Sequence, residues 1–357
     1  MAEHDSHHRK GRGATLNPSS RFDTRHTEIE RSDELAEEFP ESIATELRVE
    51  TARSIITRND SPDVPFSQSI NMYRGCEHGC IYCYARPAHA YVDLSPGVDF
   101  ETILFHKPNA PELLREALAK PGYRPSTINL GSNTDPYQPI EREQQLTRRI
   151  LEVLREARHP VSIITKGSLV LRDADILAEM AADDLASVAV SLTTLDNDLK
   201  RKLEPRTASG RQRLAVMREL SDAGIPVTTL VAPVIPAIND HELESLVAAA
   251  AEHGARRAAY IFLRLPYEVA PLFRDWLATH YPDRAAHVMS LVNQLRGGKD
   301  NSAEFGKRMR GEGAFAELLS KRFRLACKRH GLNIGEVTPL DTSKFRPPGR
   351  GGQQSLF

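Results

Sequence analysis

Cysteine is scarce in this sequence, and neither sign of charge is in excess. Four cysteines occur in 357 residues, too few for the disulfide framework of a small secreted protein. The formal net charge is −1, although 27% of the residues are charged. Because the two signs cancel, the whole chain has no basic excess that would predict a nucleic-acid partner, and only local patches could do so.

Long apolar runs are also missing. The first residues, MAEHDSHHRKGRG, contain no apolar signal region. No run approaches the roughly 18 apolar residues that a membrane-spanning helix needs. We therefore expect a protein of a reducing, bacterial-type cytoplasm that has no membrane partner.

Residues 1–63 are polar, rich in His, Arg, Glu and Ser, and only weakly periodic. Such a composition offers too little apolar surface to fold by itself, so we expect a largely disordered or loosely packed N-terminal extension. One stretch within it, GRGATLNPSSRF, leaves two interpretations open. It is either a solvated arm or a segment that packs on the folded body or touches a polyanion.

From residue 64 to residue 290, short apolar runs alternate with amphipathic ones, which predicts a repeat of strands and helices. The alternation implies right-handed βαβ units and a parallel sheet, either doubly wound or an incomplete barrel. Both architectures bind ligands at the carboxyl ends of the strands. The predicted strands are 67–72, 127–131, 161–165, 187–192, 226–231 and 259–265. The predicted helices between them are 110–119, 143–157, 171–182, 209–223 and 240–252.

The rest of the chain has a different character. Residues 267–331 have a helical pattern, and we assign a basic helical C-terminal segment to 291–340. The Gly- and Pro-rich stretch 341–357 predicts a flexible tail. Cys327 shares a helix face with apolar residues, which is typical of a buried structural thiol.

The other three cysteines are crowded into RGCEHGCIYCY, where Cys76, Cys80 and Cys83 have the spacing C-x3-C-x2-C. Three thiolates on one loop predict a soft metal centre. A structural zinc site would need a fourth ligand, for which the distant Cys327 and the neighbouring His78 are the candidates. A disulfide would leave one thiol over. A [4Fe–4S] cluster on three cysteines leaves one iron open, which suits an enzyme because a substrate or cofactor can bind there.

With Tyr82 before the last cysteine and Tyr84 after it, this motif resembles that of the radical S-adenosylmethionine (SAM) enzymes. The segments GSNTDPYQPIE, IITKG, VAVSLTTLD and LEPR are similar to the branch related to spore photoproduct lyase, a DNA-repair lyase. Within that branch, the chain resembles an uncharacterised bacterial radical SAM family almost from end to end.

The resemblance implies an α/β core built as a partial (β/α)6 barrel of the TIM type. It also implies a [4Fe–4S] cluster in which Cys76, Cys80 and Cys83 bind three irons. The amino and carboxylate groups of SAM would bind the fourth iron. An electron from an external donor would then cleave SAM to a 5′-deoxyadenosyl radical, which abstracts hydrogen from the substrate.

Three further residues stand where strand ends could hold the cofactor. Lys166 follows the third strand and could pair with the SAM carboxylate, unless it is a surface lysine. Ser191 ends the fourth strand and could bind the ribose or methionine group, or only form a turn. Arg206, in LEPR, could neutralise the carboxylate or form an ion pair with Glu204 or Glu141 instead.

The loop SNTDPYQP contributes Asn133 and Asp135, which could bind substrate or the adenosyl group, or could simply build the turn. The photoproduct lyase has a cysteine beyond its cluster that returns a hydrogen atom to its product. This chain has no cysteine between Cys83 and Cys327. That step should therefore not be assumed here, and a tyrosine such as Tyr137 is the alternative hydrogen donor.

The last five residues, QQSLF, resemble the peptide by which bacterial DNA-maintenance proteins dock on the replication sliding clamp. Gln353 would be the polar anchor, and Leu356 and Phe357 would fill an apolar pocket. The alternative is a terminus without a partner. Docking would bring the chain to DNA, whose phosphates the basic segments 307–329 and 344–350 could contact, unless these are ordinary solvated faces.

The sequence therefore predicts a radical SAM enzyme that acts on nucleic acid, with damaged DNA as the substrate class. Two other hypotheses stay open. One is radical modification of RNA or protein, and the other is a non-enzymatic metal-cluster module tethered to DNA.

Overall fold

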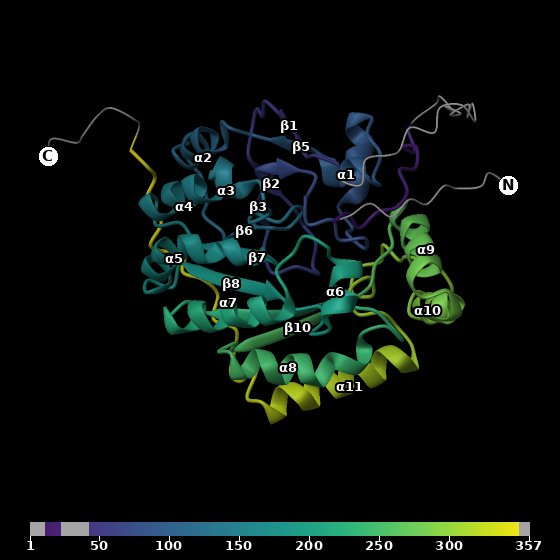
Figure 1. Cartoon of the computed structure of the whole chain (residues 1–357). Coiled ribbons are helices and arrows are strands. Elements are labelled where there is room, and N and C mark those ends of the chain that lie inside the picture. Colours follow the sequence, from purple (N-terminus) through teal and green to yellow (C-terminus); the bar gives the residue numbers. More distant parts are fainter. Residues whose placement is uncertain (1–10, 23–42, 350–357) are drawn as a thin grey trace, which may run out of the picture.

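The computed structural model describes residues 11–22 and 43–349 (Figure 1). Its main sheet has seven strands in the order β10-β9-β8-β7-β6-β3-β2. All neighbouring pairs are parallel except β2 and β3. The strands are β2 (Ile56–Arg58), β3 (Gln68–Ile70), β6 (Ile128–Leu130), β7 (Val161–Thr165), β8 (Ala186–Ser191), β9 (Val227–Val234) and β10 (Arg257–Phe262).

The six parallel strands are the six that the apolar runs predict, and they pair in chain order, so the predicted α/β fold with a partial (β/α)6 barrel is confirmed. β7 and β8 show the cause, because alternate side chains along each strand are buried. The helices that follow the strands are α1 (Asp99–Thr102), α2 (Ala110–Leu118), α3 (Glu141–Gln144), α4 (Leu146–Glu156), α5 (Ala174–Ala181), α6 (Asn197–Leu203), α7 (Gly210–Asp222), α8 (Leu243–Glu252) and α9 (Val269–His280).

The helices cover the sheet with the faces that their sequence periodicity marks. In α4, Leu146, Ile150, Leu151 and Leu154 are all buried in the main core. A capping box between Ser209 and Gln212 starts α7. Local sequence signals therefore set both where these helices lie and which side faces the sheet.

The N-terminal part differs from the expected disordered extension. β1 (Glu46–Val49) pairs with β5 (Ile103–His106), and β5 pairs with β4 (Tyr73–Arg74). Residues 46–49 of the expected extension therefore form one strand of a second, three-stranded sheet. Residues 11–22 follow the alternative in which this stretch packs on the body. Arg12 is buried because its guanidinium donates to the carbonyl oxygens of Glu101 and Ile43 at 2.6 and 2.7 Å.

The two edges of the main sheet are linked through residues near 306–309. The backbone N–H of Phe262, at the end of β10, donates to the Met309 carbonyl at 3.0 Å. Arg308 forms an ion pair with Asp63, which lies between β2 and β3. A segment distant in sequence thus joins the first and last parts of the barrel.

The C-terminal part contains α10 (Pro282–Gln294) and α11 (Ala314–Arg329), and α11 packs on α8 (Figure 1). The boundary expected at residue 290 falls inside α10. Cys327 is buried in the main core, as predicted for a structural thiol. Among the described residues, no helix is long and apolar enough to cross a bilayer.

Residues 341–349 are held against the body, in contrast to the flexible tail that their composition predicts. Phe345 contacts Tyr123 and His159, with ring centroids 5.4 Å apart in both cases. The backbone N–H of Arg346 donates to the Ala157 carbonyl at 2.8 Å. A single aromatic anchor and backbone hydrogen bonds therefore outweigh the Gly and Pro content here.

Candidate active site at the cysteine loop

The three clustered cysteines lie on a loop that directly follows β4. The loop begins at Gly75, whose φ is +78°, a conformation that favours glycine. A Cβ there would lie 2.6 Å from a Leu104 methyl group and 2.9 Å from the Phe100 carbonyl oxygen. That same carbonyl accepts a hydrogen bond from the backbone N–H of Cys76 at 3.0 Å, so close packing fixes where the first cysteine lies.

A buried arginine holds the centre of the loop. The Arg86 side chain is fully buried and donates to the carbonyl oxygens of Cys80 at 2.9 Å and Gly97 at 2.8 Å. It also forms an ion pair with Glu101. Glu101 in turn accepts hydrogen bonds from the backbone N–H groups of Gly13 and Ala14, both at 2.9 Å. The loop is therefore fastened to the N-terminal segment 11–22.

The three thiols are free, and Cys76 and Cys80 are buried while Cys83 is partly exposed. Burial raises the pKa of Cys76, and the negative charge of Asp135 adds to this. Burial also raises the pKa of Cys80 to about 12, helped by Glu204 and opposed by Lys166. Without a bound cation the Cys76 and Cys80 thiols stay protonated at neutral pH, so metal binding there would release protons.

The three cysteines of the loop are donors of the kind that an iron–sulfur cluster needs. Within residues 11–22 and 43–349, no group of three His, Cys, Asp or Glu side chains surrounds one point closely enough to hold a metal ion. In an iron–sulfur cluster the cysteines bind through soft thiolates to a larger inorganic core. Cys76, Cys80 and Cys83 on one loop meet that requirement.

Asp135 and Lys166 lie beside the cysteine loop, as expected for neighbouring strand ends. The Asp135 carboxylate accepts hydrogen bonds from the Thr165 hydroxyl and the Lys166 backbone N–H, both at 2.7 Å. Its oxygen also lies 3.3 Å from Nδ1 of His78. Burial would raise the pKa of Asp135, but His78 and these hydrogen bonds lower it to about 2. Much of the Asp135 bonding capacity therefore serves the local structure.

The other three sequence-predicted residues have different surroundings. Ser191 is buried at the end of β8. Arg206 pairs with Glu77 at 3.2 Å, rather than with Glu204 or Glu141. Asn133 is partly exposed, and its side chain donates no hydrogen bond to another described residue. Tyr137 is buried in the main core, and its backbone N–H donates to the Asp135 carboxylate at 2.9 Å.

A second buried ion pair lies against the loop and was missed by the sequence reasoning. Glu204 and Arg213 form it, and the Tyr82 hydroxyl donates to Glu204. The Thr193 hydroxyl also donates to Glu204, at 2.7 Å. Burial would raise the pKa of Glu204, yet Arg213 and Lys166 lower it to about 2. This glutamate belongs to the LEPR segment, but the neighbouring sequence gives no indication that it is buried.

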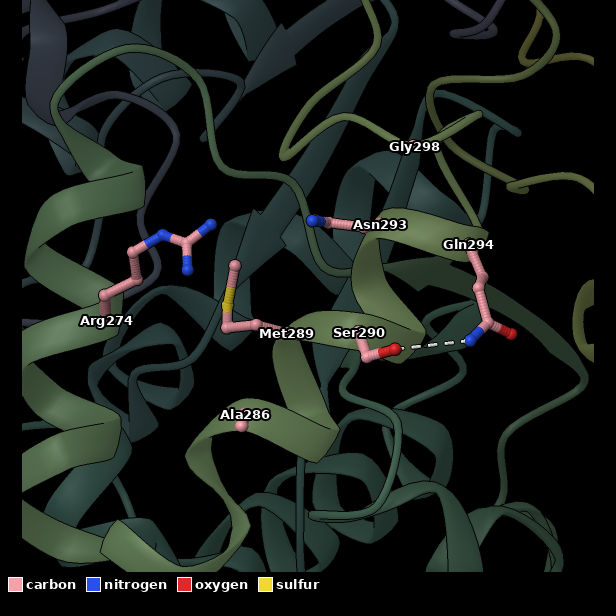
Figure 2. Close-up of a pocket in the computed structure, with 7 residues that line it drawn as sticks. All are labelled: Arg274, Ala286, Met289, Ser290, Asn293, Gln294 and Gly298. Atoms are coloured by element: carbon pink, nitrogen blue, oxygen red, sulfur yellow. Dashed lines mark hydrogen bonds between the residues drawn. The ribbon is translucent and has the colours of Figure 1, made fainter.

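A pocket of about 590 Å³ is formed by other residues (Figure 2). It is lined by residues of α9, α10 and the turn after α10, and none of the sequence-predicted site residues lines it. Arg274, at its edge, pairs with Asp300 at 2.6 Å. The predicted partner-binding residues Gln353, Leu356 and Phe357 lie outside the described residues.

Comparison with known families places the cysteine loop in context. The model of the radical SAM superfamily matches residues 70–250. An uncharacterized protein of Mycobacterium tuberculosis is 39% identical over 233 residues, which are 65% of this chain and 68% of that protein. An uncharacterized protein of Methanocaldococcus jannaschii is 29% identical over 214 residues, 60% of this chain and 76% of that protein.

Solved structures of spore photoproduct lyase share the fold. The complex with dinucleoside spore photoproduct superposes with a TM-score of 0.57 and 16% identity, covering 80% of each chain. A doubly substituted variant of that lyase, with bound AdoMet and the same dinucleoside, gives the same values. At this identity the likeness concerns the arrangement of strands and helices.

Proposed function

Because this chain belongs to the radical SAM superfamily, we propose that it cleaves SAM reductively at a [4Fe–4S] cluster and acts on nucleic acid, with damaged DNA as its substrate. The observation that carries the proposal is the loop with Cys76, Cys80 and Cys83 free and close to Lys166. When bound, the cluster and SAM would supply a 5′-deoxyadenosyl radical, formed with one electron from an external donor.

The residues of this chain would have distinct parts. The three cysteines would hold the cluster, and Arg86 would keep their loop in shape through its hydrogen bonds to main-chain carbonyl oxygens. Lys166, near Cys80 and Glu204, would attract the carboxylate of SAM. Ser191, Asn133 and Asp135 would line the cofactor side at the strand ends.

Nucleic acid is proposed on two grounds. Spore photoproduct lyase, which shares the fold, has been captured with a dinucleoside photoproduct. The QQSLF sequence resembles a sliding-clamp peptide, so we propose the clamp and DNA as partners. Lyase-type repair chemistry follows the same analogy of fold.

Anaerobic reconstitution with iron and sulfide tests the chemistry. We expect a brown protein that forms 5′-deoxyadenosine from SAM under a strong reductant, measured by mass spectrometry. Cys83→Ser should lose colour and product, whereas Cys327→Ser, a change at the buried cysteine of α11, should keep both. A colourless protein that holds one zinc and forms no 5′-deoxyadenosine would contradict the proposal.

The competing substrate classes separate in a second assay. Deuterated DNA oligonucleotides that transfer label to 5′-deoxyadenosine would support a DNA substrate, and unlabelled product with all of them would favour RNA or protein modification. A non-enzymatic cluster module predicts that Lys166→Gln and Arg206→Gln leave function intact, while the enzyme predicts weaker SAM binding.

A further inference from the structure

Arg264 lies two residues beyond the end of β10, at the edge of the cysteine loop. Its guanidinium is 5.7 Å from the centroid of the Tyr84 ring, and Tyr84 directly follows Cys83. The Tyr84 hydroxyl donates to the Ser132 carbonyl in the loop after β6. Arg264 therefore stands where the loops after β4, β6 and β10 meet.

The Arg264 guanidinium has five donors and almost nothing to donate to. Its one hydrogen bond to a described residue is a weak contact of 3.9 Å from Nη1 to the Met309 sulfur. Its Nε is buried without a partner. Within the described part of the chain, no carboxylate forms an ion pair with it, and the nearby Asp63 pairs with Arg308 instead. A half-buried cation with unmet donors is costly, unless an anion completes it.

The surroundings add positive charge. Burial lowers the pKa of Arg264, and the positive charge of the nearby Arg308 lowers it further. Arg296 uses its donors on carbonyl oxygens, among them Leu263 at 2.7 Å and Arg308 at 2.8 Å. The carboxylate of Asp63 is taken by Arg308 and by the Gly306 backbone N–H at 2.7 Å. The group formed by Arg264, Arg296, Arg308 and Asp63 therefore keeps a net positive charge.

Two exposed aromatic rings lie beside this group of arginines, Tyr84 against Arg264 and Phe305 against Arg308. Tyr84 is 49% exposed and Phe305 is 53% exposed. The Arg308 guanidinium lies 4.5 Å from the centroid of Phe305. Rings that offer a face for base stacking beside a cation that offers donors to phosphate are the features by which proteins hold single-stranded nucleic acid.

We infer that Arg264 binds a phosphodiester phosphate of the nucleic-acid substrate, with Phe305 positioned to contact a neighbouring base. This rests on the proposed nucleic-acid substrate and names the group that would fix it beside the cysteine loop. A phosphate group of the strand and a free inorganic phosphate would occupy the same site, because both offer anionic oxygens to the guanidinium. The guanidinium supplies two parallel N–H donors to its oxygens.

The test measures binding of a fluorescein-labelled, single-stranded oligothymidylate to the reconstituted protein by anisotropy at several salt concentrations. Arg264→Gln should raise Kd about tenfold to a hundredfold, the range for a hydrogen bond to a charged group. It should also reduce the slope of log K against log salt by about 0.7, the value of one lost phosphate contact. Arg264→Lys should weaken binding several-fold at an unchanged slope.

Arg274→Gln is the matched control, because Arg274 is exposed and already paired with Asp300. It should leave both Kd and slope unchanged. Inorganic phosphate should compete with the oligonucleotide for wild type and compete less for Arg264→Gln. Circular dichroism and iron content confirm that each variant is folded, and if Arg264→Gln fails this check, the loss of affinity in Arg264→Lys carries the test.

Equal binding by wild type and Arg264→Gln would overturn the inference while the proposed function stands. Weakened binding of SAM with unchanged oligonucleotide binding would also overturn it, because the anion would then be the cofactor carboxylate. If wild type forms 5′-deoxyadenosine but binds no oligonucleotide, the phosphate site and the nucleic-acid substrate fail together and the radical chemistry remains.

Discussion

Glu204 and Arg213 form an ion pair that is closed off from solvent against the cysteine loop. Their side chains are 0% and 2% exposed, and Glu204 also accepts hydrogen bonds from Tyr82 and Thr193. Such a pair stabilises the fold less by its own attraction than by the penalty that follows when one partner is lost. Its place beside Tyr82 makes it a support for the loop.

Glu204→Gln should therefore lower the free energy of unfolding by roughly 3 kcal/mol, because it leaves Arg213 charged, buried and without its counter-ion. Urea denaturation of the apoprotein measures this. Glu112→Gln removes an exposed partner of Arg149 and should cost less than about 1 kcal/mol. Equal shifts in both variants would show that the buried pair has no special weight.

Lys166 is a residue whose backbone and side chain have separate tasks. Its backbone N–H binds Asp135, while its ammonium faces Cys80 and Glu204. Lys166→Gln keeps the backbone bond and should raise the Kd for SAM about tenfold by loss of one charge-assisted contact. Equilibrium dialysis measures the Kd. Lys202→Gln, at an α6 lysine that pairs with Asp198, is the control, and an equal loss there would contradict a role for Lys166.

His159 gives the stability a predictable pH dependence. It is fully buried, with Nε2 2.9 Å from the Tyr123 hydroxyl, and burial lowers the pKa of its ring from 6.5 to about 4. A folded-state pKa below the unfolded value means that its contribution is present above pH 6.5 and is lost as the pH falls towards 4. The loss from pH 7 to pH 5 should be about 2 kcal/mol.

The check is urea denaturation at pH 7 and pH 5. His159→Gln cannot take up the proton and should lose correspondingly less stability between the two values than wild type. His287→Gln, at an exposed histidine of α10, should keep the wild-type difference. Burial lowers the pKa of His89 to about 4 as well, so part of the difference should remain in His159→Gln. A difference as large as that of wild type would rule out a contribution from His159.

At the scale of elements, the segment 11–22 acts as a strap over the cysteine loop. A Cβ on Gly13 would lie 1.8 Å from the Gly79 carbonyl oxygen, a distance that real atoms do not reach. Arg12 and the Glu101 hydrogen bonds then fasten the strap to α1. The strap and the loop can therefore only be correctly placed together.

Gly13→Ala should displace the strap and expose the loop, so the reconstituted protein should lose iron faster in air. The iron-to-protein ratio over time measures this. Gly349→Ala is the control, because a Cβ there meets nothing within 4 Å. Similar loss rates for wild type and Gly13→Ala would show that the strap does not protect the loop.

At the scale of the whole molecule, the described chain ends far from the cysteine loop. Lys344 donates to the Asp183 carbonyl at 2.7 Å, and Arg346 donates to the Ala157 carbonyl. These acceptors precede β8 and β7, at the amino ends of the strands, whereas the cysteine loop lies with the residues at the carboxyl ends. The last described residues thus leave the carboxyl-end face uncovered.

This arrangement predicts that a sliding clamp and an oligonucleotide bind at the same time. Gln353→Ala and Leu356→Ala should weaken clamp binding at least tenfold, since each removes an anchor of the peptide, while Gln354→Ala should not. Surface plasmon resonance on immobilised clamp measures this, with the oligonucleotide added second. Competition between the two ligands, or no clamp binding by the intact chain, would contradict the prediction.

A structural feature can be predicted from the sequence when the residues that determine it lie close together along the chain. The six parallel strands and five core helices follow from apolar periods of two and 3.6 residues, which each segment carries within itself. The adjacency of Cys76, Cys80 and Cys83 is likewise a local fact of the chain. The family, the fold class and the cysteine loop were therefore all within reach of the sequence.

Contacts between segments that are distant in the sequence could not be predicted. Arg206 pairs with Glu77, and Arg308 pairs with Asp63 across 245 positions, while no periodicity records such pairs. The strap is a further case, because its sequence is polar and gives no sign that Arg12 is buried. The sequence by itself determined the elements and the cysteine motif because those depend on neighbours along the chain. Only the tertiary structure decided which charges are neutralised and which, like Arg264, are left over, because that depends on what the fold brings together.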